Sequence, residues 1–483
     1  SCSKSNVENA AKPEVNIDSI SVEQFDDIRV LVSMNAKGSN EIKKVGICWS
    51  KSPMPTITDS SRSLSSPYST VINKIGENAT YYFRAYIQIA DKTIYSESKS
   101  ISTGGLNVLI DKEYNNGRSR NIIDVKETAD GSFIALITSS GIYSTYWPEL
   151  ILFNKSGDVV WNKEYAQYSS QSPVAVLEIE GGFLLATTDW TAVNFGHIFT
   201  KLDNNGNVLW EKKYGTKRNK DLMRILDNKN NSLIITLREY DDMKNGIREN
   251  CVITNYLIDL NGNLLSSTAY SADNGLAEGS PPYTFNDSND LGYAAAYSWF
   301  NVNQSVVLYD ITVKKISFDN RLLWEKKYGG AADEFVVQLT SSANKNWNLL
   351  GYSSSFGLTK PSAWLFQVDA QTGVIVWQAV YSNLKYGTSG VTHPRSLYEK
   401  SSDSYYISGN VANYYVTTSS AFIAKLRPSG QTSWEYTFDN AKYGNRAGVK
   451  IFVYGHDIYL FSIKTGPTPN SPSGIVFTKI QEI

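Results

Sequence analysis

The chain has 483 residues and a formal net charge of −1, from 46 Lys and Arg against 47 Asp and Glu. This balance excludes the basic character of a nucleic-acid-binding protein and the polybasic signature of a membrane-surface protein. The 31 Tyr, 18 Phe and 11 Trp argue against long disordered tracts, and three Cys and three His are too few for a disulfide framework or a His-rich metal centre. No apolar run is long enough to span a bilayer.

Residues 1–13 form a polar stretch without strand or helix periodicity, and a Cys stands at its second position. The run Ser1-Cys2-Ser3-Lys4 resembles the start of a mature bacterial lipoprotein, in which the thiol of the Cys carries lipid. The resemblance implies a tether over residues 1–13 that is lipidated at Cys2. A disordered tail with an incidental Cys is the alternative.

Residues 14–104 contain short strand patterns separated by turn residues and show no helical period. About six short strands over this length predict an immunoglobulin-like β-sandwich. The stretch 75–86 resembles the tyrosine corner of fibronectin type III domains, with Tyr81 as the residue whose hydroxyl bonds back to the backbone. Glu77 stands where that family usually has Pro. The resemblance implies a spacer domain.

Residues 105–483 contain a repeated motif, in which an apolar pair, or Thr-Ser in the last copy, leads to Trp and then, four residues later, to Tyr or Phe. The motif's Trp residues are Trp161, Trp210, Trp324, Trp377 and Trp434. With two degenerate copies included, its last aromatic residues are Tyr114, Tyr165, Tyr214, Tyr270, Tyr328, Tyr381 and Phe438. A period of about 50 residues without helical pattern predicts propeller blades of four strands, a to d. Recurrence at one position predicts that these Trp residues pack between blades.

The blades are out of phase with the chain. In blade one we expect strands at 122–128, 133–138, 149–153 and 159–165. The segment opens on a d strand at 107–114 and closes on a c strand at 474–480. We therefore predict an all-β protein, in which the β-sandwich is followed by a seven-bladed propeller over 105–483. The N-terminal strand completes blade seven and leaves no open sheet edge.

Strand direction places the b–c connections and the d–a connections on one face of the propeller. These connections are long and aromatic-rich, whereas the turns of the opposite face are short and polar, so we expect a binding face. The candidate ligand-binding residues are Tyr146, Trp147, Trp190, Trp299, Phe300 and Tyr414, with polar partners in Arg118, Arg218, Asn301 and Arg395. The b–c connection of blade seven, 465–473, has no aromatic residue, so we expect the site to lie toward blades one to four. The alternative is that the Trp residues seal gaps between blades.

Other motifs carry little chemistry. The stretch 367–377 resembles the repeat of quinoprotein propellers, but one blade alone has it, so we expect no quinone. The stretch Tyr328–Glu334 resembles a junction of lipoprotein propellers with this period, and we expect Asp333 and Glu334 in a solvated turn. His393 is the best candidate for a catalytic base but has no recognisable partner. Sialidase, hydrolase, zinc-protease and phosphate-loop signatures are absent from the sequence.

The tail, the spacer and the propeller together resemble outer-membrane lipoproteins of Bacteroidetes glycan-uptake systems. The resemblance implies a non-catalytic protein at the cell surface that binds a polysaccharide or oligosaccharide, without cofactor or metal. Its further expected partners are the membrane, through the lipid on Cys2, and other outer-membrane uptake proteins. A polysaccharide-degrading lyase or hydrolase using the same face, or a protein-interaction scaffold, is the alternative.

Overall fold

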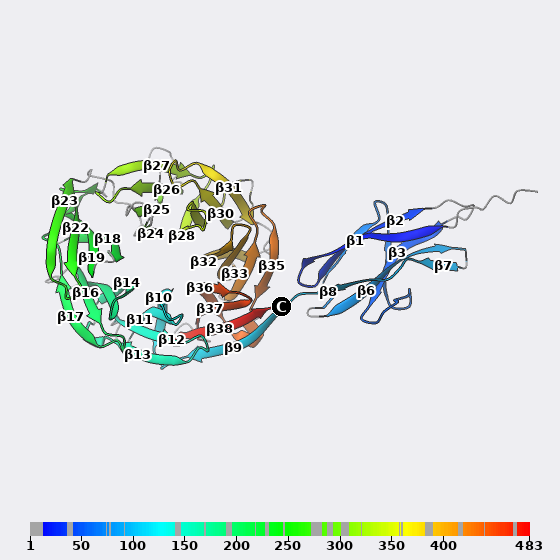
Figure 1. Ribbon diagram of the computed structural model, residues 1–483, viewed down its shortest axis with the longest axis horizontal. Helices are drawn as coiled ribbons and strands as arrows, with labels where there is room; N and C mark the ends of the chain where they lie inside the picture. The colour runs from blue at the N-terminus through cyan, green and yellow to red at the C-terminus, as the bar shows by residue number, and fades with distance from the viewer. Residues whose placement is uncertain are drawn as a thin grey trace, which may run out of the picture. The chain divides into compact units, whose positions relative to one another are not determined.

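The computed structural model describes residues 13–35, 42–73, 75–76, 79–90, 92–140, 146–168, 171–189, 196–217, 219–227, 231–244, 247–271, 283–286, 293–300, 309–319, 321–356, 358, 361–381, 390–413, 419–438, 440–466 and 471–483. Contacts divide the chain into two units, residues 1–107 with 481–483 and residues 108–480 (Figure 1). Nearly all described regular structure is β-strand. The exceptions are the short helices η2 (Ala166–Tyr168) and α1 (Asn440–Tyr443).

The first unit consists of two sheets that share one apolar core. One sheet consists of β1 (Glu14–Gln24), β2 (Asp27–Asn35) and β5 (Ser69–Ile72). The other consists of β4 (Ser60–Leu64), β3 (Ile42–Ser50), β6 (Thr80–Ile89) and β7 (Lys92–Tyr95), and β8 (Lys99–Ser102) also pairs with β6. Residues that alternate along β2 and β6, such as Val30 and Phe83, fill the core. The sequence did not predict β4, because its polar residues lack any apolar alternation.

The local prediction of a tyrosine corner in this unit is confirmed. The buried Tyr81 donates its hydroxyl hydrogen bond to the carbonyl of Ile75, as the tyrosine-corner resemblance implied. Cys48 and Cys251 are buried, and neither is in a disulfide bond. Burial raises the pKa of Cys48 to about 11, so this thiol is a poor nucleophile at neutral pH.

The described part of the second unit forms seven four-stranded antiparallel sheets, which stand around a common centre like propeller blades (Figure 1). Blade one consists of β10 (Ser119–Glu127), β11 (Phe133–Ser140), β12 (Tyr146–Phe153) and β13 (Val159–Glu164). Blade two consists of β14 (Gln171–Ile179), β15 (Gly182–Asp189), β16 (Gly196–Leu202) and β17 (Val208–Lys213). Blade three consists of β18 (Asn219–Asp227), β19 (Ser232–Tyr240), β22 (Val252–Asp259) and β23 (Leu264–Ser271). A hairpin of β20 (Met243–Lys244) and β21 (Ile247–Arg248) extends blade three.

Blade four consists of β24 (Tyr283–Asn286), β25 (Tyr293–Phe300), β26 (Tyr309–Ile316) and β27 (Leu322–Tyr328). Blade five consists of β28 (Glu334–Ser341), β29 (Trp347–Ser353), β30 (Ser362–Val368) and β31 (Ile375–Tyr381). Blade six consists of β32 (Gly390–Ser401), β33 (Ser404–Asn413), β34 (Ser419–Leu426) and β35 (Thr432–Thr437). The seventh sheet, called here the closing blade, is β36 (Arg446–Tyr454), β37 (Asp457–Lys464), β38 (Gly474–Glu482) and β9 (Leu106–Tyr114). The predicted pairing of the two ends of the propeller segment is confirmed.

Burial along the blades follows from this arrangement. The two middle strands of blade two are buried at every position, because neighbouring blades cover both faces of each sheet. The outer strand β17 is largely exposed. In Figure 1 the first strand of each blade lies toward the centre and the fourth lies at the rim.

The repeated Trp and Tyr latch blades one, two and four to the blade that follows each of them. In blade two, Trp210 Nε1 donates to the carbonyl of Leu260 at 2.9 Å, and the Tyr214 hydroxyl donates to the carbonyl of Gly262 at 2.8 Å. Leu260 and Gly262 belong to the turn between the third and fourth strands of blade three. The same pair of bonds joins blade one to blade two and blade four to blade five. The structural role predicted for these Trp residues is confirmed at these three junctions.

Gly262→Ala should lower the stability of the protein more than Gly117→Ala does. Gly262 lies in the latch, whereas Gly117 lies in the connection between β9 and β10. Both glycines have a positive φ, +75° and +78°, so an alanine costs about 1–2 kcal/mol of backbone strain at either position. A Cβ on Gly262 would also lie 3.1 Å from the ring of Trp210, whereas a Cβ on Gly117 meets nothing within 4 Å. Urea unfolding should show an additional loss of about 1–3 kcal/mol for Gly262→Ala. Equal losses would contradict the latch.

Candidate functional site

The face predicted to bind ligand carries the connections from second to third strands and from blade to blade; we call it the upper face. Trp190, Arg218, Asn301 and Tyr414 lie outside the described residues, as does the lipidation candidate Cys2. Trp299 and Phe300 end strand β25, where they are in register with Asp310 and Tyr309 of β26. They were expected in a connection, so the strand is longer than predicted.

Tyr146 and Trp147 also lie in a strand rather than in a connection. They begin β12 and are in register with Ser140 and Ser139 of β11. Aromatic residues suit a pleated, half-buried surface, so they extend the strand beyond its purely aliphatic part. Alternation along β12 sends the two rings to opposite sides of the sheet.

The side that each ring faces follows from the cores below. Ile151 and Phe153 lie in the core shared with the closing blade, so Trp147 faces the closing blade. Leu150 and Leu152 lie in the core shared with blade two, so Tyr146 faces blade two. Trp147 is 7% exposed, which contradicts the expected open aromatic plane, whereas Tyr146 is 48% exposed. Tyr146 is therefore the predicted aromatic residue whose described ring is open to a ligand.

Arg118 covers the ring of Trp147. Its Cζ atom lies 5.0 Å from the ring centroid, and its Nη1 atom pairs with Oε2 of Glu164 at 2.5 Å. Asn116 Nδ2 donates to Oε1 of the same carboxylate at 3.1 Å. These contacts fix the connection between β9 and β10, so Arg118 lies where the sequence predicted a polar partner.

A buried ion pair supports this corner from below. Arg120 Nη2 and Nε donate to the two carboxylate oxygens of Glu149 at 2.5 and 3.0 Å, and Ser139 Oγ donates to the same carboxylate at 2.7 Å. The two charged side chains are 3% and 0% exposed. The backbone of Arg120 also exchanges hydrogen bonds with Ser473, so this pair ties blade one to the closing blade.

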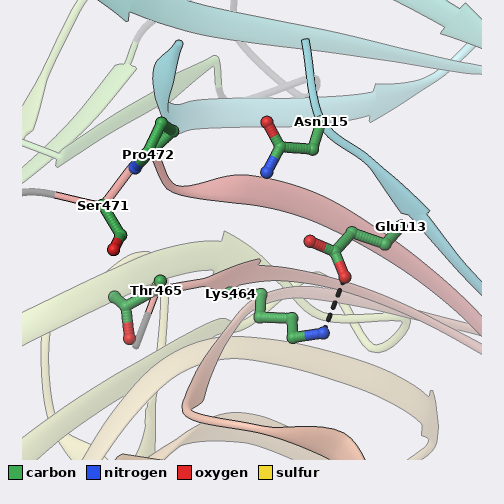
Figure 2. A pocket seen from close by; sticks show the side chains of 7 residues that line it. Glu113, Asn115, Lys464, Thr465, Ser471 and Pro472 are labelled. Carbon is green, nitrogen blue, oxygen red and sulfur yellow. Dashed lines mark hydrogen bonds and ion pairs between the residues drawn. The ribbon is translucent and has the colours of Figure 1, made fainter. Parts of the chain in front are cut away.

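A cavity of about 350 Å³ opens on the upper face of the closing blade. Both ends of the propeller segment line it, through Glu113, Asn115, Lys464, Thr465, Gly466, Ser471 and Pro472. In Figure 2 the labelled side chains lie around the opening, and the dashed line marks the pair of Lys464 Nζ with Glu113 Oε2, which are 2.6 Å apart. The lining offers hydroxyl, amide, carboxylate and ammonium groups, which suit a ligand rich in hydroxyl groups.

The cavity lies outside the region of blades one to four in which the sequence predicts the site, and that placement stays a prediction. The cavity lies at the b–c connection of blade seven, which the sequence led us to discount because it contains no aromatic residue. Its polar lining comes from segments about 350 positions apart, as Glu113 and Lys464 show. The closure of the ring was the available sequence signal, because it brings residues 113–115 beside residues 464–472.

Arg395 and His393 lie within strand β32 rather than in the expected connection. Arg395 is exposed, and its Nε donates to Asn410 Oδ1 at 3.2 Å. His393 is half-buried against Tyr352, with ring centroids 6.0 Å apart. Burial and the charge of Arg395 lower the pKa of His393, which favours the neutral imidazole.

His197 should make the protein less stable in acid. It is buried in β16, and burial lowers its pKa from 6.5 to about 4. The unfolded chain therefore binds a proton between these values that the folded chain does not bind. The His197 contribution is complete above pH 6.5 and falls by about 2 kcal/mol at pH 5. Urea midpoints of the wild type and His197→Phe should differ in pH dependence over this range, and parallel curves would contradict the assignment.

The described residues contain no group of three or more His, Cys, Asp or Glu that could hold a metal ion. Among these residues, helices long and apolar enough to cross a membrane are also absent.

No protein-family model and no curated protein matches the chain. Solved structures similar to it include a puromycin hydrolase (13% identity, TM-score 0.46, 75% of this chain and 52% of that one). They also include the polysaccharide lyase Uly1 (11%, 0.43, 76% and 91%) and Drosophila Plexin A in complex with Semaphorin 1b (8%, 0.40, 77% and 86%). The chain spans about half the length of the puromycin hydrolase. At these TM-scores the likeness carries no weight for function.

Proposed function

We propose that this protein is a non-catalytic, cell-surface glycan-binding protein that uses the upper face of its propeller. One observation carries the proposal: the upper face presents both the exposed ring of Tyr146, on the blade-two side of blade one, and the cavity of the closing blade with its hydroxyl, amide and charged groups. Sugars present flat CH-rich faces edged by hydroxyl groups, so an open aromatic ring and convergent polar groups suit them. Arg118 adds a cation that Glu164 holds in place.

The rest of the chain fits a surface protein in this proposal. The first unit would be a fibronectin type III-like spacer, supported by its two sheets and the bond from Tyr81 to Ile75. A lipid on Cys2 would hold the protein at the outer membrane, beside other uptake proteins. Detergent partitioning of the wild type, lost in Cys2→Ala, would test the anchor.

Tyr146→Ala should weaken glycan binding without unfolding the protein. A wild-type glycan array identifies the ligand, and calorimetry with that ligand compares the variants. We expect a loss of about 1–3 kcal/mol in affinity, by analogy with stacking of a base on an aromatic ring. The melting temperature should change little, because the ring is already half exposed. Phe318→Ala is the matched control, since Phe318 is an exposed aromatic residue (39%) in a turn of the opposite face.

Two results would reject this function. A wild type that binds no glycan removes the proposal altogether. A Tyr146→Ala variant with unchanged affinity removes Tyr146 from the site.

A polysaccharide-degrading enzyme is the second candidate, favoured by the position of His393. Its imidazole is kept neutral near Arg395, as a general base requires. Incubation of a bound polysaccharide with the wild type and His393→Gln distinguishes the two functions. Shortened products that disappear in the variant would indicate catalysis.

A further inference from the structure

A second place on the upper face, the junction of blades four and five, is built around two glycines between β27 and β28. A Cβ on Gly329 would lie 2.3 Å from Asp310 Oδ1 and 2.5 Å from Glu334 Oε2. A Cβ on Gly330 would lie 2.5 Å from the Cβ of Ser355. Only glycines allow these approaches, so Asp310 and Ser355 both pack closely against one short stretch of backbone.

Buried hydrogen bonds make this junction rigid. Glu334 is fully buried, and its carboxylate accepts bonds from Ser353 Oγ at 2.8 Å and from the Gly330 amide at 3.0 Å. Ser355 Oγ accepts a bond from the Ala332 amide at 2.8 Å. The expectation that Glu334 lies in a solvated turn is therefore wrong, because its carboxylate holds two connections together.

Next to this rigid junction, Phe356 adopts an unfavourable backbone conformation. Its φ is +59°, which is rare for a bulky residue and costs about 1–2 kcal/mol. The side chain is nevertheless 48% exposed, with its ring 5.3 Å from that of the buried Trp364. The contact with Trp364 covers only part of the ring, so packing alone does not account for the strain, and strain of this kind marks functional positions.

Asp310 supplies the polar side of the junction. It is half-buried at the start of β26, and burial together with the Glu334 carboxylate raises its pKa. The carboxylate oxygens of Asp310 can accept hydrogen bonds from the hydroxyl groups of a sugar. The neighbouring Asp333 and Glu334 would repel an acidic sugar.

We propose that Phe356 and Asp310 form a glycan subsite at this junction that takes a neutral sugar residue. The sugar ring stacks on Phe356, and one of its hydroxyl groups bonds to Asp310. This inference rests on the proposed function and names the class of sugar bound at one part of the upper face.

The test is native gel electrophoresis of the full chain through soluble polysaccharides. Laminarin, xyloglucan and galactomannan are the neutral probes, and alginate and polygalacturonate are the acidic ones. Phe356→Gly removes the ring and the strain together. Lys345→Gly is the matched control, because Lys345 has a φ of +67° in a turn on the opposite face of the same blade. Phe356→Asn and Asp310→Asn provide second variants.

We expect a neutral polysaccharide to retard the wild type and Lys345→Gly equally, and Phe356→Gly and Asp310→Asn at least fivefold less. The melting temperature of Phe356→Gly should equal or exceed that of the wild type. Retardation by acidic polysaccharides alone, unchanged retardation of Phe356→Gly, or a marked fall in its melting temperature would overturn the inference. If Tyr146→Ala loses binding while Phe356→Gly does not, the subsite fails and the proposed function stands. No retardation of the wild type rejects both.

Discussion

A chain that begins at Gly105 is expected to fold and melt cooperatively, whereas a chain that begins at Gly117 is expected to aggregate. The second truncation removes β9, the outer strand of the closing blade. It leaves the edge of β38 unpaired, and unpaired edges promote association between chains. It also removes Asp111, whose carboxylate accepts two hydrogen bonds from Arg446, at 2.9 and 3.2 Å.

Size-exclusion chromatography and thermal melting of the two truncated chains check this prediction. The Arg446 side chain is 2% exposed, so its loss of Asp111 should be severe. Asp111→Asn in the full chain isolates that part of the effect, because it keeps β9 in place. If both truncated chains are monomeric and melt at one temperature, the pairing of the two ends does not stabilise the ring.

Arg120→Met is expected to destabilise the propeller by about 3–5 kcal/mol, because it leaves the Glu149 carboxylate buried without its partner. Met fills much of the space of Arg but supplies no donor. In the double variant Arg120→Met with Glu149→Leu the buried charge is gone as well. Most of the lost stability should therefore return, which equilibrium unfolding of both variants can show.

The exposed pair of Arg321 and Asp319 provides the control. Their side chains are 77% and 42% exposed, so Arg321→Met should change stability by less than about 1 kcal/mol. If Arg120→Met behaves like Arg321→Met, the buried pair has no special role. If the double variant is as unstable as Arg120→Met, the geometry of the corner matters more than its charge.

The fold was predictable because its signals are local and repeated. The spacing from Trp210 to Tyr214, found again along the chain, reflects one set of bonds that joins three of the blades to the turn of the next. The phase shift between the first and last strands was visible for the same reason. Strand ends were less predictable, since aromatic residues at the start of β12 continue a strand that aliphatic residues define.

The site was harder to predict because the type of a residue does not determine how far its side chain is exposed. Trp147 and Tyr146 are neighbours in one strand, yet alternation buries the first against the closing blade and leaves the second open. Phe356 is one of the aromatic residues in the upper-face connections, but its residue type does not set it apart, since its importance lies in a backbone angle and in the buried Glu334 that supports the junction. Residues such as Glu113 and Lys464 become partners only when the ring closes.

The seam of the closing blade also has a mechanical consequence. Gly105 exchanges backbone hydrogen bonds with Ile483, and the far end of β9 lies beside Gly474, so β9 and β38 run in opposite directions. Tension that enters the ring through residues before Leu106 would therefore peel β9 from β38 one bond at a time, rather than load all bonds at once. The ion pairs of Asp111 and Glu113 lie further along β9, so they would break after the bonds near Leu106. Under tension on its N-terminal side, the ring would therefore lose the backbone bonds near Leu106 first and the ion pairs of Asp111 and Glu113 later.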